Sequence, residues 1–293
     1  DVDVASYYPS IILKLKLAPE SMGVDFTRVY QSLVTRRLYA KAMGDKVTAD
    51  TLKITLNGSF GKLGSMYSIF YAPALMIQTT ITGQLGLLML IERLDAAGMR
   101  VVSANTDGVV ILCKKRQQAE LDAVTFEWMM DTSFELERSD YSALHSRDVN
   151  NYIAVKTDGG VKRKGIFAEP GLSKNPEFMI VGDALCALLS KRVPVEETIS
   201  QCRDIRKFVA VRRVDGGAQW RDQYLGKAVR YHYSSESEAE ECITYARNGN
   251  KVPKSDGARP LMVLPDAFPG DVDIDRYVDL AREALKDMGV EHA

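Results

Sequence analysis

The sequence predicts an α+β fold. Two pairs of short β-branched segments, within residues 100–113 and 151–168, are each separated by only a few turn residues, which is typical of antiparallel hairpins. Longer segments with helical periodicity lie before and after these pairs and do not alternate with single strands. Strands segregated from helices in this way favour an α+β architecture over a doubly wound parallel sheet.

The composition is that of an ordinary folded chain. Its 293 residues are 46% hydrophobic and 26% charged, with a formal net charge of −1, and are enough for two or three subdomains. The overall charge therefore gives no argument for a nucleic-acid partner. Residues 203–230, however, hold eight Lys or Arg against three Asp. Such a segment is compatible with binding a phosphate backbone, although most basic runs are simply solvated surface.

Four cysteines lack any Cys-x-x-Cys spacing, and the chain has only three histidines, which argues against a zinc site. Reduced thiols in a cytoplasmic protein are the simpler interpretation.

The first part of the chain predicts a strand and three helices. Residues 1–7 begin with alternating Asp and Val and are expected to form a strand that Pro9 ends. Thr27 can cap a helix that runs to about Met43, before Gly44. A second helix is expected over residues 47–57, followed by a run spaced by Gly58, Gly61 and Gly64.

A long apolar helix is expected from Pro73 to about Gly98. Its residues 74–91 carry no charge and are nearly long enough to cross a bilayer. They also contain Gln, Thr and Gly, and Glu92 and Arg93 follow at once, which favours a buried core helix and no membrane association.

The remaining segments are predicted from turn and periodicity signals. Strands are expected at 100–104, 108–113, 151–157 and 161–168, with a helix at 117–130 and an Asp-Gly-Gly turn at 158–160. Beyond Pro170 the pattern predicts mostly helical and basic structure, with a second Asp-Gly-Gly turn at 215–217.

Two carboxylates are candidates for chemistry. Asp3 lies in the first predicted strand, and Asp107 lies in the turn of a later hairpin. Each alone is more often a water-facing or turn residue. Together they could converge on two magnesium ions, which would clamp the attacking and leaving oxygens of a phosphoryl transfer.

A basic set lies between these two acids in the chain. Arg37 and Lys41 are one helical turn apart, and Lys53 and Asn57 are one turn apart on the next helix. Such a set could hold a triphosphate, and the glycines that follow would allow a substrate base to approach the backbone.

The residues match a known pattern in order along the chain. "DVASYYPSI" at 3–11 resembles motif A of the family B DNA polymerases, and "KITLNGSFG" at 53–61 resembles motif B. "ANTDG" at 104–108 is similar to motif C, and "KRKG" at 162–165 is similar to the lysine element that contacts the primer. The amino-acid sequence resembles that of bacteriophage members of the family.

The resemblance implies an architecture. Residues 1–24 and 65–170 would form the palm, an antiparallel sheet with packed helices; residues 25–64 would form short helical fingers, and residues 171–293 a mostly helical thumb. The implied activity is template-directed addition of dNTPs to a primer 3′ end. Primer–template DNA would be the partner. An N-terminal exonuclease domain or a companion chain, and the host cytoplasm as location, are also expected.

The resemblance also implies residue roles. Asp3 and Asp107, with the Val4 carbonyl, would hold two Mg²⁺ ions, for which Mn²⁺ could substitute. Tyr8 would be the steric gate against a 2′-hydroxyl. The catalytic Lys53, with Arg37 or Lys41, would hold the triphosphate, and Asn57 and Gly61 would shape the base-pair pocket. The DNA-binding set would be Lys162, Lys164, Arg212, Arg213 and Lys227.

The chain departs from the family pattern at three positions. Asn105 replaces the first Asp of motif C, which removes a supporting charge but leaves Asp107 as the ligand. Gly58 and Phe60 replace residues that carry hydroxyls. Two alternatives stay open: a degenerate, non-catalytic palm that acts as a DNA-binding module, which Asn105 supports, and a reverse-transcriptase-like palm, which normally has two adjacent acids in the hairpin.

Overall fold

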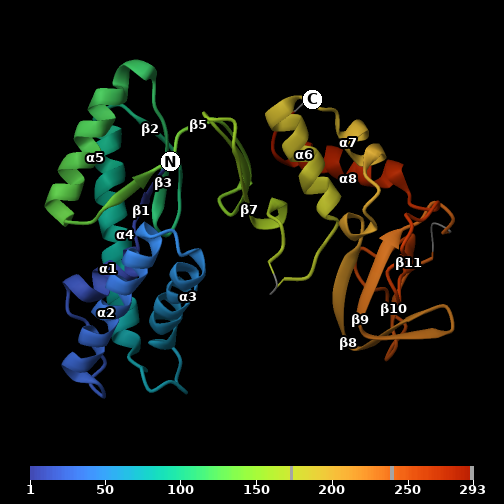
Figure 1. Cartoon of the computed structure of the whole chain (residues 1–293), viewed down its shortest axis with the longest axis horizontal. Coiled ribbons are helices and arrows are strands. Elements are labelled where there is room, and N and C mark those ends of the chain that lie inside the picture. Colours follow the sequence, from blue (N-terminus) through green and yellow to red (C-terminus); the bar gives the residue numbers. More distant parts are fainter. Residues whose placement is uncertain (172–173, 238–240, 291–293) are drawn as a thin grey trace. The chain divides into compact units, whose positions relative to one another are not determined.

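The computed structural model describes residues 1–171, 174–237 and 241–290 and divides the chain into two compact units, Asp1–Ser139 and Asp140–Ala293. Among these residues it has eight α-helices and three sheets, all of whose strand pairs are antiparallel (Figure 1). The predicted α+β class is confirmed. The boundary between the units falls inside residues 65–170, which the sequence analysis treated as one segment.

The sheet of the first unit has the strand order β2-β3-β1-β4. Its strands are β1 (Val2–Val4), β2 (Arg100–Ala104), β3 (Gly108–Leu112) and β4 (Leu136–Arg138). The predicted strand at residues 1–7 is therefore too long. The chain turns at Ser6, which has a left-handed φ of 49°, and enters helix α1 (Tyr7–Lys14). Pro9 lies in the first turn of α1, where proline is tolerated because no N–H is needed.

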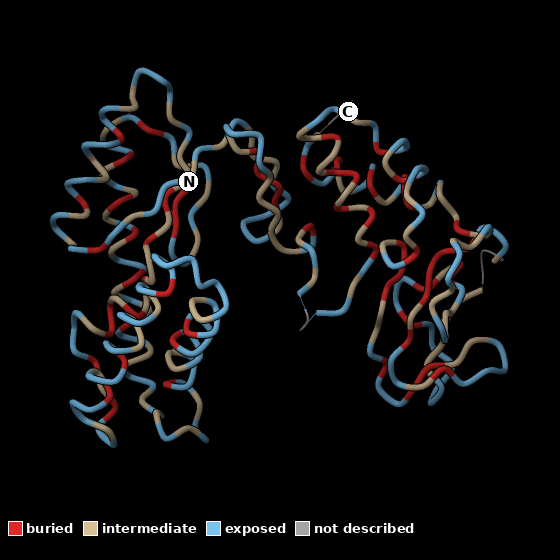
Figure 2. Tube along the Cα trace, viewed as in Figure 1, coloured by how far each residue is buried: buried red, intermediate tan, exposed pale blue. Residues whose placement is uncertain are grey.

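Two helices cover this sheet and form its core. Helices α4 (Pro73–Ala96) and α5 (Gln118–Thr132) bring Leu90 and Trp128 against Val2 and Val109 of the strands. The short 3₁₀ helix η1 (Lys115–Gln117) leads into α5. Figure 2 marks the buried residues of this core in red.

Helix α4 is buried on one face only. Thr79, Gly83, Leu87, Leu90 and Leu94 are buried, whereas Ile77, Ile81, Leu85 and Leu88 are exposed. The prediction of a core helix is thus correct for one side of α4. Within the described ranges, α4 is also the one helix that is long and apolar enough to cross a membrane, by length and composition alone.

Helices α2 (Gly23–Ala42) and α3 (Lys46–Lys62) form an antiparallel pair with a small core of their own. Helix α2 begins four residues before the predicted cap, Thr27, whose hydroxyl instead donates to the Val24 carbonyl at 3.0 Å. Asp45 caps α3 by accepting the Thr48 amide at 3.0 Å. Helix α3 continues past the predicted end at residue 57, through Gly58 and Gly61, and ends before Gly64.

The second unit begins with a three-stranded sheet in the order β5-β6-β7. Its strands are β5 (Tyr141–Asp148), β6 (Asn151–Lys156) and β7 (Val161–Lys164), followed by η2 (Gly165–Phe167). The predicted turn at 158–160 is present: the Lys156 amide donates to the Gly160 carbonyl at 2.7 Å.

The rest of the second unit combines helices with a four-stranded sheet. The helices are α6 (Met179–Lys191), α7 (Val195–Gln201), η3 (Ile205–Lys207) and α8 (Ile274–Asp287). The sheet has the order β10-β8-β9-β11, with β8 (Ala210–Trp220), β9 (Gln223–Tyr233), β10 (Thr244–Tyr245) and β11 (Ala258–Pro260). The mostly helical prediction for this region is wrong, because the basic segment lies largely on the β8–β9 hairpin.

The predicted turn at 215–217 is also wrong. Gly216 and Gly217 lie inside β8 at φ values of 84° and 88°, where the strand register shifts. The space beside Gly217 is occupied by the Tyr224 ring, which leaves no room for a side chain. The hairpin reverses later, at Arg221, whose φ is 51°. The glycines therefore form an irregularity in a long strand and not the turn itself.

Candidate functional site

Asp3 occupies the central strand of the first unit's sheet. It lies directly opposite Gly108 on β3 and directly opposite Glu137 on β4. The side chains of Val2 and Val4 are buried on the other face, so the alternation of the strand leaves Asp3 half-buried on the face away from that core.

Asp107 lies in the turn between β2 and β3, and Asn105 organises this turn. The Asn105 side-chain oxygen accepts the backbone N–H of Asp107 at 3.2 Å and that of Gly108 at 3.0 Å. The backbone N–H of Asn105 in turn donates to the Gly108 carbonyl at 3.0 Å. Asn105 thus has a structural task for which a carboxylate is not needed, since an amide oxygen accepts both N–H groups.

A backbone hydrogen bond connects the two acidic segments. The Val4 amide donates to the Asp107 carbonyl at 2.6 Å, which fixes β1 against the hairpin turn. Gly108 leaves space at this junction. A Cβ built on Gly108 would lie well under 3.0 Å from the Asp3 carboxylate and 3.1 Å from the Val2 carbonyl oxygen. The sheet therefore forms a cradle for the Asp3 side chain that any residue other than glycine would fill.

The donors at this junction fit a hard divalent cation. Two carboxylates and a backbone carbonyl are oxygen ligands of the kind that Mg²⁺ and Mn²⁺ take, and Mg²⁺ usually adds water and substrate phosphate to one or two protein acids. Within the part of the chain that the structure describes, no group of three or more His, Cys, Asp or Glu side chains could hold a metal by itself.

Tyr8 lies beside this junction on α1. Its ring stacks on Phe60 of α3 with ring centroids 4.2 Å apart. Burial raises the pKa of Tyr8, and the Asp107 carboxylate raises it further. The stacking of Phe60 on this ring was not predicted from the sequence.

The basic residues of α2 contact the same region. Arg37 hydrogen-bonds the Ser6 hydroxyl at the start of α1, and its Nε is buried with no hydrogen-bond partner among the described residues. Lys41 forms an ion pair with Glu137, the residue opposite Asp3. Of the two cations that were expected to hold a triphosphate, Arg37 therefore contacts the start of the helix that carries Tyr8, and Lys41 contacts β4, the strand beside the one that carries Asp3.

The predicted residues of α3 share its exposed face. Lys53, Asn57 and Gly61 are exposed, whereas Leu52 and Leu56 are buried on the other side. No atom lies within 4 Å of a Cβ built on Gly61, so the backbone there is open to a ligand.

Lys162 and Lys164 lie on one face of β7 in the second unit. Their amines are 5.7–6.0 Å from the Tyr152 ring centroid, and Lys162 is also 5.8 Å from that of Tyr141. Arg163, between them, pairs with Asp183 at 2.8 Å. The alternation therefore leaves two lysines on an aromatic face.

The basic residues of the β8–β9 hairpin differ from one another. Arg212 pairs with Glu177 at 2.8 Å and donates to the Tyr231 hydroxyl at 3.0 Å, so its charge stabilises the fold. Arg213 and Lys227 are exposed. Arg213 is 3.9 Å from the exposed Asp215, an ion pair that solvent screens strongly.

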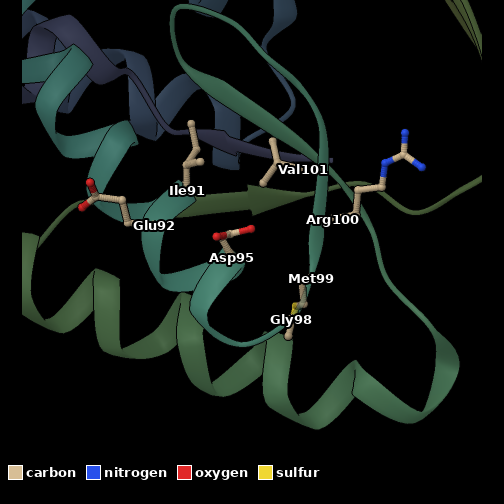
Figure 3. A pocket seen from close by; sticks show the side chains of 7 residues that line it. All are labelled: Ile91, Glu92, Asp95, Gly98, Met99, Arg100 and Val101. Atoms are coloured by element: carbon tan, nitrogen blue, oxygen red, sulfur yellow. The ribbon is translucent and has the colours of Figure 1, made fainter.

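A shallow depression of about 460 Å³ lies elsewhere in the first unit, where α4 ends and β2 begins (Figure 3). Glu92 and Asp95 line it, and the Arg100 side chain points away from them. It includes none of the predicted site residues.

This arrangement of sheets and helices is similar to part of a solved DNA polymerase. The chain is similar over its whole length to the solved family B DNA polymerase from the hyperthermophilic archaeon Pyrobaculum calidifontis, with a TM-score of 0.57 and 15% sequence identity. It spans 45% of that polymerase's length. No protein-family model and no curated protein matches the sequence. The likeness therefore establishes the fold.

Proposed function

We propose that this chain is the polymerising portion of a template-directed DNA polymerase of the family B type. It adds dNTPs to a primer 3′ end, with primer–template DNA as its partner. The palm is formed by the sheet that carries Asp3 and Asp107, the fingers by α2 and α3, and the thumb by the region beyond β7. The similarity to the bacteriophage branch of the family stays a prediction from the motifs.

The observation that carries the proposal is the Asp3–Asp107 junction. The two acids are about a hundred residues apart in the sequence, yet their segments are joined by the Val4–Asp107 hydrogen bond and by the β1–β3 pairing. Arg37 hydrogen-bonds Ser6, which lies between Asp3 and Tyr8 in the first segment. A chance match of separate motifs would not bring their functional residues to one end of a sheet.

The carboxylates of Asp3 and Asp107 and the Val4 carbonyl would hold two Mg²⁺ ions, or Mn²⁺ in their place, which when bound supply charge stabilisation for phosphoryl transfer. Tyr8, whose ring stacks on Phe60, would contact the sugar and exclude a 2′-hydroxyl. Lys53 on the open face of α3, with Arg37 and Lys41, would hold the triphosphate and stabilise charge on the leaving pyrophosphate.

The incoming triphosphate would compete for cations that already have partners. Lys41 is paired with Glu137, and Arg37 is bound to Ser6. A triphosphate carries more negative charge than either partner, so both side chains would exchange a protein contact for a phosphate contact. Lys162, Lys164, Arg213 and Lys227 would hold the DNA backbone through contacts that weaken with salt.

The turn contacts of Asn105 bear on the non-catalytic alternative. That alternative rested on Asn105 as a lost acid, but the Asn105 oxygen accepts two backbone N–H groups that position Asp107. An amide is suited to that task, so this residue is no longer evidence for a degenerate site.

A primer-extension assay tests the proposal. The purified chain is incubated with a labelled primer on a longer template, four dNTPs, and Mg²⁺ or Mn²⁺, with EDTA and ribonucleotides as comparison reactions. Metal-dependent extension with dNTPs is expected. A chain that binds the primer–template but extends it with neither metal would contradict the proposal.

A further inference from the structure

Gly108 is buried at the junction, and its backbone conformation does not explain why it is glycine. Its φ lies outside the left-handed region, unlike that of Gly98, which ends a helix at a φ of 67°. An alanine could adopt the backbone of Gly108 without strain. The requirement for glycine is therefore one of space.

The space beside Gly108 is taken by the Asp3 carboxylate. The two residues are direct partners across β1 and β3, so their side-chain positions share one face of the sheet. A Cβ on Gly108 would lie well under 3.0 Å from a carboxylate oxygen of Asp3 and 3.1 Å from its Cγ. One of the two side chains would have to move.

Gly108 cannot move away to relieve this clash. Its backbone N–H donates to the side-chain oxygen of Asn105 at 3.0 Å, and its carbonyl accepts the backbone N–H of Asn105 at 3.0 Å. The neighbouring Asp107 carbonyl accepts the Val4 amide at 2.6 Å. The backbone at this point is held by the turn on one side and by β1 on the other.

Asp3 would therefore be the group that moves, and its direction is restricted. Glu137 lies directly opposite Asp3 on the other neighbouring strand. A carboxylate that is displaced from Gly108 moves toward this second acid, whose charge is partly offset by Lys41. Like charges directly opposite one another in a sheet are unfavourable.

We propose that Gly108 is a positioning residue: its lack of a side chain leaves the space in which the Asp3 carboxylate is held beside the Asp107 turn, and this space sets the affinity of the acid pair for a divalent cation. The inference rests on the proposed function, because it takes Asp3 and Asp107 as metal ligands.

The test is Mn²⁺ binding to the chain without DNA or nucleotide, followed by electron paramagnetic resonance. Residues that orient metal ligands change metal affinity by about 10- to 100-fold, and Gly108→Ala is expected to weaken Mn²⁺ binding by at least about tenfold. Gly270→Ala is the matched control, since no atom lies within 4 Å of a Cβ built there, and it should bind Mn²⁺ like the wild type.

A double variant separates positioning from a general loss of structure. The severe clash requires the Asp3 carboxylate, so Gly108→Ala is expected to lower the Tm much more in the wild type than in an Asp3→Ala background, where only the 3.1 Å approach to the Val2 carbonyl oxygen remains. It should likewise have no further effect on Mn²⁺ affinity in that background. If Gly108→Ala alone unfolds, recovery of the folded state in the double variant supports the inference.

The outcomes distinguish this inference from the proposed function. Wild-type Mn²⁺ affinity in a folded Gly108→Ala variant overturns the positioning role, as does an equal loss with and without the Asp3 carboxylate. Both results leave the proposed function standing if the wild type extends primers. Wild-type Mn²⁺ binding that does not depend on Asp3 or Asp107 would overturn the metal site and this inference together.

Discussion

The Val4 amide donates a hydrogen bond to the Asp107 carbonyl at 2.6 Å. This single bond joins the first strand of the chain to a hairpin turn about a hundred residues later. It sets the distance between the backbone that carries Asp3 and the backbone that carries Asp107. The predictions below test what these two segments do together.

Asp107→Asn is expected to reduce Mg²⁺-dependent primer extension by at least about a thousandfold, because loss of transition-state charge stabilisation at this kind of site costs roughly 10²–10³ in rate or more. Duplex binding, measured by fluorescence anisotropy, should change little. Asp95→Asn, an exposed acid at the far end of α4, is the control and should extend normally. Near-normal extension by Asp107→Asn would contradict the ligand assignment.

Asn105→Asp is expected to retain extension, since a carboxylate oxygen can accept the same two N–H groups. Asn105→Ala removes the one oxygen that accepts both N–H groups. It should lower the free energy of unfolding by about 1 kcal/mol, because each hydrogen bond contributes roughly 0.5–1.5 kcal/mol and the site is partly exposed. Urea denaturation measures the second effect. A strong loss of activity in Asn105→Asp would show that the register of this motif is wrong.

Tyr8→Ala is expected to admit ribonucleotides, because removal of the ring opens the space that a 2′-hydroxyl would occupy. The ratio of kcat/KM for a dNTP and the matching rNTP should fall by at least about tenfold, the factor that corresponds to 1.4 kcal/mol of discrimination. Single-nucleotide insertion assays measure this ratio. Unchanged discrimination would remove Tyr8 as the gate.

Arg212 and the pair Arg213 and Lys227 should respond differently to substitution. Arg212→Ala removes one partner from both Glu177 and Tyr231, which keep their contacts with Lys254, and is expected to cost about 1–3 kcal/mol of stability. The double change Arg213→Ala and Lys227→Ala should preserve stability but weaken DNA binding and reduce its salt dependence. Measuring both variants by thermal unfolding and by DNA titration at several salt concentrations separates the two roles. Equal DNA binding by the double variant would exclude these residues from the DNA surface.

His232 should make the stability of the second unit depend on pH. Burial lowers the pKa of His232, although Asp271, 3.3 Å from its Nε2, acts in the opposite direction and Arg259 adds to the lowering. The unfolded chain, with the usual pKa of about 6.5, then binds more protons than the folded chain below that pH. The free energy of unfolding should fall as the pH drops through 6.5, by at most about 1.4 kcal/mol per pH unit.

The control for this effect is His232→Gln, which removes the titrating group. Hydrogen bonds from Ser234 and Arg259 hold the pKa of Asp271 below its usual range despite burial, so the Asp271 contribution is lost only at lower pH. Burial and Arg192 also lower the pKa of His145 in the same unit, so the difference between wild type and variant in denaturation at pH 7 and pH 5.5 is what reports on His232. An equal change in the variant and the wild type would contradict the prediction.

The sequence was sufficient for features that depend on local patterns. Alternation on either side of Asp3 predicted a strand with the acid away from the core, and Asp158–Gly160 predicted the turn that the structure contains. Local patterns failed where an unusual backbone conformation decided the outcome. Ser6 adopts a left-handed φ that starts a helix, and Gly216 and Gly217 bend a strand that the sequence interpretation ended there.

Strand register could not be predicted for a different reason. Asp3 lies between Gly108 and Glu137, and Lys41 pairs with Glu137. Both contacts join residues that are about 100 or more positions apart in the sequence. No periodicity within one segment contains that information. Gly108 in particular is ordinary as a turn residue and acquires its significance only when the opposite strand is known.

The central position of β1 has a consequence for how the first unit folds. Val2 pairs with Val109 on one side and with Arg138 on the other. The three residues of β1 therefore lie between β3 and β4, two strands from much later in the chain. Contacts of such high contact order form late and slowly, because a long loop must close before they contribute any stability. The junction between β1 and the Asp107 turn is therefore expected to form among the last events in folding of this unit, after the hairpin and helices that surround it.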